Sequence, residues 1–468
     1  MKKLLSLLIV AVMLTFSLTA CFEPIPGADE EPTKPETQQV MTYDEFCAAE
    51  LDSKVVVETY VQAKQSWWFN SDKGTGLGTF YTQAEDGGYF IYEMPCTEEE
   101  YNALTVGTKI RVTGYKSEWE GEIEIIDATY EILDGSYIAD AADVTALLGD
   151  DSLVNYQNQK VAFKGLTVVA SNDEGATFLY KWNGSGKDGD DLYFKAAVNG
   201  KTYTFVIESY LCGKNTEVYQ AVKALKVGDV IDMEGFLYWY GGAQPHITSV
   251  KNLAPMSYDE FSAAELDSEV IVDTYVQAKQ SWWFNSEKGT GLGTFYTQAE
   301  DGGYFIYEMP CTEEEYNALT VGTKIRVIGY KAEWSGEIEI IDARYVILDG
   351  SYVADAIDVT ALLDDESLVN YQNQKVAFKG LTVVASNDEG ATFLYKWNGS
   401  GKDGDDLYFK ASVNGKTYTF VIESYLCGAN TEVYKAVKAL KVGDVIDMEG
   451  FLYWYSGAQP HVTSVIVK

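Results

Sequence analysis

Histidine, proline and basic side chains are scarce in this chain of 468 residues. Two histidines leave little material for imidazole-based metal binding or acid–base catalysis. Lys and Arg total 35 against 71 Asp and Glu, which gives a formal net charge of -36. Proteins that follow a nucleic-acid backbone neutralise its phosphates with Lys and Arg, so the composition disfavours that class.

Long apolar runs are missing after residue 20, which excludes a membrane protein with several spans. Whole-chain disorder is excluded as well, because hydrophobic residues make up 46% and aromatic residues 14% of the chain. At roughly 150 residues per domain, the length indicates about three domains as a first approximation.

The N-terminus has the pattern of an export signal. Lys2 and Lys3 precede an apolar stretch that is short for a membrane span, which indicates a secretory signal peptide over residues 1–20. Its ending, Leu18-Thr19-Ala20-Cys21, resembles the lipobox of bacterial lipoproteins.

The lipobox resemblance implies that Cys21 becomes the first mature residue and carries a diacylglyceryl group. Two acyl chains are enough for stable anchoring, so the chain is expected on a bacterial cell membrane, facing outside the cytoplasm. A plain signal peptide that ends near a cysteine is the alternative. Residues 21–40 are acidic and hold four of the nine prolines, which indicates an extended tether.

A tandem duplication organises the rest of the chain. Residues 41–253 and 256–468 are related by a constant offset of 215 and differ at 23 of 213 positions. Each copy holds an older repetition, in which Leu104, Val106 and Gly107 return 121 residues later. Identity between the copies reflects their common origin, so it gives no means of choosing functional residues.

Local patterns in the first copy predict short strands and helices. Thr97 with Glu100 has the spacing of a capping box, which predicts a helix start. Turn residues at 85–88 and at 199–200 indicate hairpins. The expected strands are 55–63, 78–81 and 89–92 before a helix at 97–103, and 161–169, 176–182, 191–198 and 202–207 before a helix at 216–224.

Three strands, a helix and a strand–turn–strand follow the order of the five-stranded OB barrel. The sequence therefore resembles bacterial surface lipoproteins built of tandem OB-fold modules. The resemblance implies a mainly β fold with four small OB-like barrels of five or six strands, each with a short helix between strands three and four. Another small β-barrel or a sandwich is the alternative. The expected units are 41–135, 136–255, 256–350 and 351–468.

Strand alternation places aromatic side chains on the outer surface of the barrels. Ile231 lies on the apolar side of its strand, which puts Phe236, Tyr238 and Tyr240 on the outer side. Trp119 holds the position that matches Tyr240 in the first unit. The loop at this end of the strand is one of two loops that flank the binding face of an OB fold.

The other flanking loop carries Trp67, Trp68 and Phe69. Adjacent aromatic rings suit a cap on the barrel end, packing against a neighbouring unit, or a stacking platform for a planar ligand or sugar ring. The acidic composition favours a neutral glycan or a protein surface over a polyanion. The candidate ligand-binding residues are Trp67, Trp68, Phe69, Trp119, Tyr238 and Tyr240, with Trp282, Trp283, Phe284, Trp334, Tyr453 and Tyr455 in the second copy.

Other chemistry-bearing residues receive structural interpretations. The acidic loop 183–191 lacks EF-hand spacing, so it is interpreted as a solvated hairpin loop without a metal, with a calcium site as the alternative. The acids between Glu118 and Glu124 are interpreted as solvated edge charges rather than as a glycosidase pair. His246 and its copy His461 are expected to be structural.

The cysteines do not support a disulfide framework. Five cysteines remain besides Cys21, and an odd number cannot all be paired. Cys96 and Cys212, with their repeats Cys311 and Cys427, are interpreted as small buried hydrophobes. A Cys96–Cys212 bridge is the alternative.

The sequence predicts a non-enzymatic protein without a cofactor that acts by binding or surface interaction. A glycan or a protein is the expected ligand, and the membrane is reached through the lipid on Cys21. Single-stranded nucleic-acid binding at the cell surface is the second hypothesis, because the fold suits it although the charge does not. An accessory module of a secreted hydrolase is the third.

Overall fold

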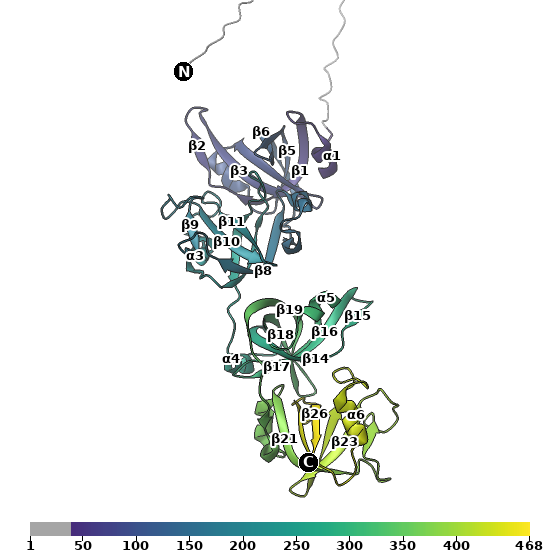
Figure 1. The fold of residues 1–468 in the computed structure, drawn as a ribbon. Helices are drawn as coiled ribbons and strands as arrows, with labels where there is room; N and C mark the ends of the chain where they lie inside the picture. The colour runs from purple at the N-terminus through teal and green to yellow at the C-terminus, as the bar shows by residue number, and fades with distance from the viewer. Residues whose placement is uncertain (1–38) are drawn as a thin grey trace, which may run out of the picture.

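The computed structural model describes residues 39–468, so the signal peptide, Cys21 and the tether up to residue 38 lie outside the described residues. In the described part, four closed β-barrels follow one another along an elongated molecule, which confirms the predicted fold class (Figure 1). Each barrel has its own cluster of buried apolar side chains. None of the helices in this part of the chain has the length and apolar character needed to cross a bilayer.

Barrel 1 begins the described chain. Its elements are α1 (Tyr43–Ala48), β1 (Lys54–Lys64), β2 (Trp68–Asn70), β3 (Thr75–Gln83), β4 (Gly88–Pro95), α2 (Glu98–Ala103), β5 (Thr108–Trp119) and β6 (Glu122–Ser136). The strands pair in the order β1-β5-β6-β4-β3, and β1 also pairs with β3 to close the barrel. The β4–β6 pair is parallel. This is the OB order, with α2 between the third and fourth barrel strands as predicted.

Barrel 2 repeats this plan with extra edge elements. Its elements are β7 (Ala142–Asp143), η1 (Thr145–Leu147), η2 (Asp151–Tyr156), β8 (Lys160–Val169), β9 (Phe178–Tyr180), β10 (Leu192–Val198), β11 (Lys201–Ile207), α3 (Glu217–Ala224), β12 (Val230–Phe236) and β13 (His246–Asn252). The order is β8-β12-β13-β11-β10, closed by a β8–β10 pair.

Barrels 3 and 4 reproduce barrels 1 and 2. Barrel 3 holds α4 (Tyr258–Ala263), β14 (Glu269–Lys279), β15 (Trp283–Asn285), β16 (Thr290–Gln298), β17 (Gly303–Pro310), α5 (Glu313–Ala318), β18 (Thr323–Trp334) and β19 (Glu337–Ser351). Barrel 4 holds β20 (Ile357–Asp358), η3 (Thr360–Leu362), η4 (Glu366–Tyr371), β21 (Lys375–Val384), β22 (Phe393–Tyr395), β23 (Leu407–Val413), β24 (Lys416–Ile422), α6 (Glu432–Ala439), β25 (Val445–Phe451) and β26 (His461–Val467).

Local sequence signals account for where these elements begin and turn. The backbone N–H of Glu100 donates to the Thr97 hydroxyl at 3.2 Å, and the Glu100 carboxylate accepts from Thr97 N–H at 2.7 Å. This is the predicted capping box. Asn199 and Gly200 have φ angles of 51° and 72°, which are the two left-handed positions of a type I′ turn between β10 and β11.

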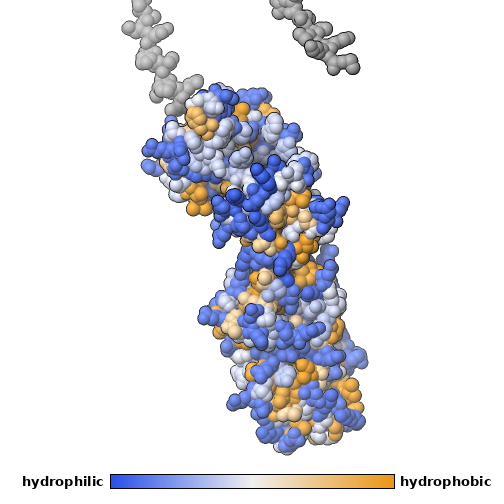
Figure 2. Space-filling model, turned by 90° about the vertical axis from the view of Figure 1, so that its left-hand side faces the viewer, coloured by the Kyte–Doolittle hydropathy of each residue, from blue (hydrophilic) through white to orange (hydrophobic). Residues whose placement is uncertain are grey.

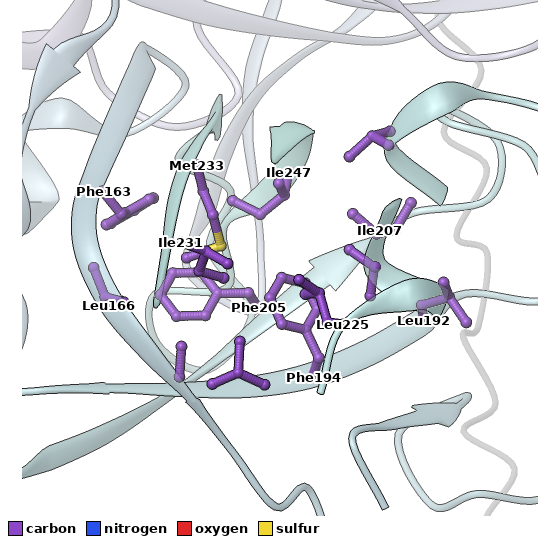
Figure 3. Close-up of a cluster of buried hydrophobic side chains, with 14 of the residues drawn as sticks. Phe163, Leu166, Leu192, Phe194, Phe205, Ile207, Leu225, Ile231, Met233 and Ile247 are labelled. Atoms are coloured by element: carbon purple, nitrogen blue, oxygen red, sulfur yellow. The ribbon is translucent and has the colours of Figure 1, made fainter. Parts of the chain in front are cut away.

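The core of barrel 2 illustrates how each barrel closes (Figure 3). Phe163, Phe194 and Phe205 come from β8, β10 and β11 and point toward Ile231 and Met233 of β12. The inward side of β12 is therefore the one that strand alternation predicted. Complete burial of one such side chain contributes about 1.5–3 kcal/mol to folding.

The cysteines of the described chain are unpaired. Cys47 is exposed, whereas Cys96, Cys212, Cys311 and Cys427 are buried. Their interpretation as small buried hydrophobes is confirmed, and the alternative Cys96–Cys212 bridge is absent. Burial raises the pKa of the Cys96 thiol to about 11, so this thiol stays protonated near neutral pH.

Barrels 1 and 2 meet through a cluster of aromatic rings, which we call the inner joint. It consists of Tyr81, Phe90, Phe236, Tyr238 and His246. The rings of Tyr81 and Phe236 stack with centroids 4.6 Å apart, and the Tyr81 hydroxyl lies 2.9 Å from His246 Nδ1. Phe236 points out of barrel 2 as predicted, but it is not a surface residue. Barrel 1 covers its ring and leaves it 2% exposed. His246 has the structural role that the sequence analysis expected.

Barrels 2 and 3 meet through a different set of residues, which we call the outer joint. Its apolar members are Val230, Leu253, Ile271, Ile328, Val346 and Leu348. Arg344 of β19 donates to Asp232 of β12 at 2.5 Å, and Arg326 donates to the Leu253 carbonyl at 3.0 Å.

Hydrophilic residues cover most of the face of the molecule that Figure 2 shows, with apolar residues in small groups between them.

Candidate ligand-binding cleft

A cleft of about 1250 Å³ opens between barrels 1 and 2. One wall comes from β3, β4, β6 and the loops next to β2 and β5, and the other comes from β10, β11 and the loop between β12 and β13. In an OB fold, the second and third strands and these loops form the binding face. The faces that correspond to the OB binding face in the two barrels therefore lie opposite each other across one cleft. Its aromatic lining consists of the half-buried rings Tyr193 and Tyr238 and of exposed rings, which are Trp68, Tyr92, Trp119, Trp182, Tyr210 and Tyr240.

Two of the predicted residues stand on the wall of barrel 1. Trp68 begins β2, which pairs with β3 so that Trp68 lies opposite Leu77. This pairing folds the loop after β1 into a hairpin and leaves the Trp68 side chain 43% exposed at the cleft. Trp119 ends β5, at the turn into β6, and is 60% exposed. The structure thus brings the two predicted loops of barrel 1 to one site.

The wall of barrel 2 holds predicted and unpredicted rings. Tyr238 and Tyr240 lie in the loop after β12, as the alternation of that strand indicated. Sequence reasoning missed Trp182, which follows β9 and is 74% exposed, and Tyr210, which follows β11 and is 68% exposed. The available signal was a large aromatic side chain in a polar loop, such as Trp182 immediately before Asn183.

Trp67 and Phe69 do not line the cleft with Trp68. The half-buried Trp67 indole donates its N–H to the Cys96 carbonyl at 3.0 Å. Its ring lies so close to Gly76 that a Cβ built there would be 2.3 Å from it. Trp67 therefore holds the hairpin on the barrel, which is the capping role that the sequence left open. Phe69 points to solvent elsewhere on the hairpin.

Hydrogen bonds fix the two walls relative to each other. The N–H of Ser66 donates to the Tyr210 carbonyl at 2.7 Å, and the N–H of Gly241 donates to the Glu120 carbonyl at 2.7 Å. The carboxylate of Glu122 accepts from the N–H of Trp239 at 2.8 Å. These bonds cross between the barrels beside the cleft and hold its two walls together.

The lining of the cleft is acidic, and one of its acids, Glu93, pairs with Lys73, which lies outside the lining, at 3.4 Å. The lining includes Glu93, Glu124, Asp191 and Glu208, but no Lys or Arg. Burial raises the pKa of Glu124 to about 7, with the nearby Glu93 carboxylate adding to the effect. Burial also raises the pKa of Glu208 to about 7.

The interpretation of Glu122 and Glu124 as solvated edge charges was wrong. Glu122 is fully buried and Glu124 nearly so. Both point out of barrel 1, as alternation requires, but barrel 2 covers that side of β6. Glu118 and Glu120, before the turn, are exposed as expected.

The second copy carries the same residues at the matching positions between barrels 3 and 4. The Tyr296 hydroxyl lies 2.9 Å from His461 Nδ1, and Ser281 N–H donates to the Tyr425 carbonyl at 2.7 Å. Trp334 and Tyr455 have ring centroids 5.3 Å apart. Trp282 bonds the Cys311 carbonyl at 3.0 Å, so it repeats the hairpin role of Trp67. The remaining predicted rings of this copy, Trp283, Phe284 and Tyr453, match Trp68, Phe69 and Tyr238.

The sequence matches no known family model and no curated protein. Among solved structures, it is similar to a replication protein A heterotrimer bound to single-stranded DNA, at 9% identity and a TM-score of 0.22 over 63% of this chain and 94% of that one. A murine DNA-binding protein bound with double-stranded DNA has 11% identity and a TM-score of 0.22 over 42% of this chain and 97% of that one. Similarity at this level carries no argument about the ligand.

Proposed function

We propose that this chain is a non-enzymatic glycan-binding protein with one binding cleft in each copy. The observation that carries the proposal is the set of exposed aromatic rings on both walls of the cleft. A sugar ring has apolar C–H faces that pack on aromatic rings, and hydroxyls that need polar partners. Ligand sites combine large apolar or aromatic surfaces with a few placed polar groups in this way.

The polar groups of the cleft suit hydroxyls. Gln65 and Gln244 supply amide donors and acceptors, and Asp191 and Glu208 supply carboxylate acceptors. Single-stranded nucleic acid, the competing ligand class, also stacks on aromatic rings. Its phosphates need basic partners, and the lining has no Lys or Arg.

The proposal includes lipid anchoring at Cys21, outside the described residues, and a tether over residues 21–40. Two clefts on one anchored chain would raise avidity for a polymer that reaches both, without any new contact. The cell-surface location rests on the lipobox resemblance alone. Palmitate labelling followed by membrane fractionation tests it, with Cys21→Ser as the variant.

Ligand binding is tested with a glycan array and then by calorimetry on residues 39–468, which lack Cys21 and its lipid. Trp119→Ala with Trp334→Ala should weaken binding, because loss of a stacked ring costs about 1–3 kcal/mol, as measured for bases. Phe69→Ala with Phe284→Ala is the matched control, since these rings lie outside the cleft lining. Binding of single-stranded DNA but of no glycan would overturn the proposal.

A further inference from the structure

Glu124 is a carboxylate without a partner in the wall of the cleft. It is 9% exposed and lines the cleft. Within residues 39–468, its carboxylate accepts no hydrogen bond from a protein donor and has no basic side chain beside it. The other acids of the lining are at least partly compensated, and Glu93 pairs with Lys73 at 3.4 Å. Glu208 accepts N–H bonds from Tyr210 and Leu211 at 3.0 and 2.8 Å, and Asp191 accepts one from Ser209 at 2.8 Å.

The surroundings of Glu124 are aromatic. Glu124 pairs with Phe90 across the parallel β4–β6 ladder. The Phe90 ring lies 5.5 Å from the Tyr238 ring and 6.4 Å from the Tyr92 ring, between centroids. Aromatic faces attract a positive charge, most strongly where water is excluded. Rings around a buried carboxylate therefore form a setting that favours a cation.

The charges around the cleft also favour a cation. A buried carboxylate is costly unless it is paired or hydrogen-bonded, so an unpaired one beside a cleft lacks a counter-ion. The described residues supply none to Glu124, because the lining has no Lys or Arg and Lys73, outside the lining, pairs with Glu93 at 3.4 Å. His246 does not serve either, since burial lowers its pKa to about 3.

We propose that the ligand is a sugar chain with protonated amino groups, and that Glu124 in the first copy and Glu339 in the second bind the ammonium. This inference rests on the proposed function and specifies its ligand class. The rings on the two walls pack against the sugar faces, while the amine completes the charge of the buried carboxylate. Glu339 has the same 9% exposure and stands beside Phe305 in the matching ladder.

The test uses three oligosaccharides that share one β-1,4-linked backbone and differ at one ring carbon: glucosamine, N-acetylglucosamine and glucose oligomers. We expect the glucosamine oligomer to bind the full described chain at least about tenfold more tightly than the other two, because a charged hydrogen bond is worth more than a neutral one. Added salt should weaken the glucosamine complex and leave the other two nearly unchanged.

The variant Glu124→Gln with Glu339→Gln keeps the side-chain shape and removes the charge. It should abolish the preference for glucosamine while binding of the glucose oligomer persists. Glu118→Gln with Glu333→Gln, at exposed positions outside the lining, is the matched control and should keep the preference.

The outcomes separate the two proposals. Equal binding of all three oligomers would overturn the ammonium site and leave glycan binding intact. Binding of none of them, together with capture of a lysine-rich peptide or of single-stranded DNA, would overturn both. A preference for glucosamine that survives in the Glu124→Gln, Glu339→Gln variant would show that the ammonium binds elsewhere.

Discussion

The inner and outer joints both connect one barrel to the next, but they are built from different chemistry. The inner joint is a set of aromatic rings that is identical in the two copies, with Tyr81, Phe236 and His246 matched by Tyr296, Phe451 and His461. The outer joint includes residues in which the copies differ. Barrel 3 has Ile328, Arg344 and Val346 where barrel 1 has Thr113, Thr129 and Glu131.

This difference shows that the unit of structure is the barrel pair. The inner joint brings the two walls of the cleft together, so the cleft depends on it. The outer joint only links one pair to the next, through a patch specified by a few substituted side chains. Gly165 illustrates the close approach, since a Cβ built there would lie 2.7 Å from a Val346 methyl carbon.

The largest effect is expected from removing the centre of the inner joint. Phe236→Ala with Phe451→Ala deletes a buried ring in each pair, and such changes cost about 3–5 kcal/mol. Because Phe236 lies between the barrels, glycan binding should fall along with the melting temperature. Calorimetric melting and titration measure the two effects. Unchanged stability would mean that the pairs do not depend on this stack.

The contact between barrels 1 and 2 should also make the stability of the protein depend on pH. Burial raises the pKa of Glu122 from 4.5 to about 8, although bonds from Trp239, Asn158 and Gln157 oppose the shift. The folded state therefore keeps a proton that the unfolded state has released, and stability should fall as pH rises from about 4.5 to 8. The burial of Glu122 was missed because strand alternation shows which side is outside a barrel, but not which neighbour covers it.

Glu122→Gln with Glu337→Gln should flatten this dependence. At pH 8 the variant should be more stable than the parent by at least about 1.4 kcal/mol, the equivalent of one pKa unit. The neutral amide still offers an acceptor to Trp239 N–H. Denaturant melts across the pH range measure the effect, with the exposed pair Glu118→Gln, Glu333→Gln as control. A parent whose stability rises over the same range would contradict the assignment.

Breaking the outer joint should cost less stability than breaking the inner joint. Ile328→Thr, Arg344→Thr and Val346→Glu give barrel 3 the residues of barrel 1, and we expect a cost of about 1–3 kcal/mol, confined to the joint. Small-angle scattering should then report a more variable distance between the pairs, while glycan binding at each cleft is unchanged.

The fragment 41–253 should fold alone, because each of its two barrels has its own core. A lowered melting temperature for all barrels would show that the pairs share a core.

Sequence reasoning reached the fold and part of the site for identifiable reasons. Turn residues, capping boxes and strand alternation are local, so they predicted the barrels and the outward positions of Trp119 and Tyr238. Trp182 and Tyr210 join the cleft only because barrel 2 docks face to face with barrel 1. That docking depends on Phe236 and on backbone bonds such as Ser66 to Tyr210, which no local pattern reveals.

The smallest effect on stability is expected from Trp68, in contrast to its neighbour Trp67. Trp67→Ala with Trp282→Ala removes an indole that donates to the Cys96 or Cys311 carbonyl, and should cost about 1–3 kcal/mol through the lost hydrogen bond and packing. Trp68→Ala with Trp283→Ala removes exposed rings and should stay within about 0.5 kcal/mol of the parent. Binding should respond to the Trp68 change, because that ring lines the cleft. Melting curves and titrations of the two double variants provide the comparison, each variant serving as the control for the other. If the Trp68 variant had a lower melting temperature and unchanged affinity, Trp68 would be a structural cap. It would then not belong to the ligand-binding surface.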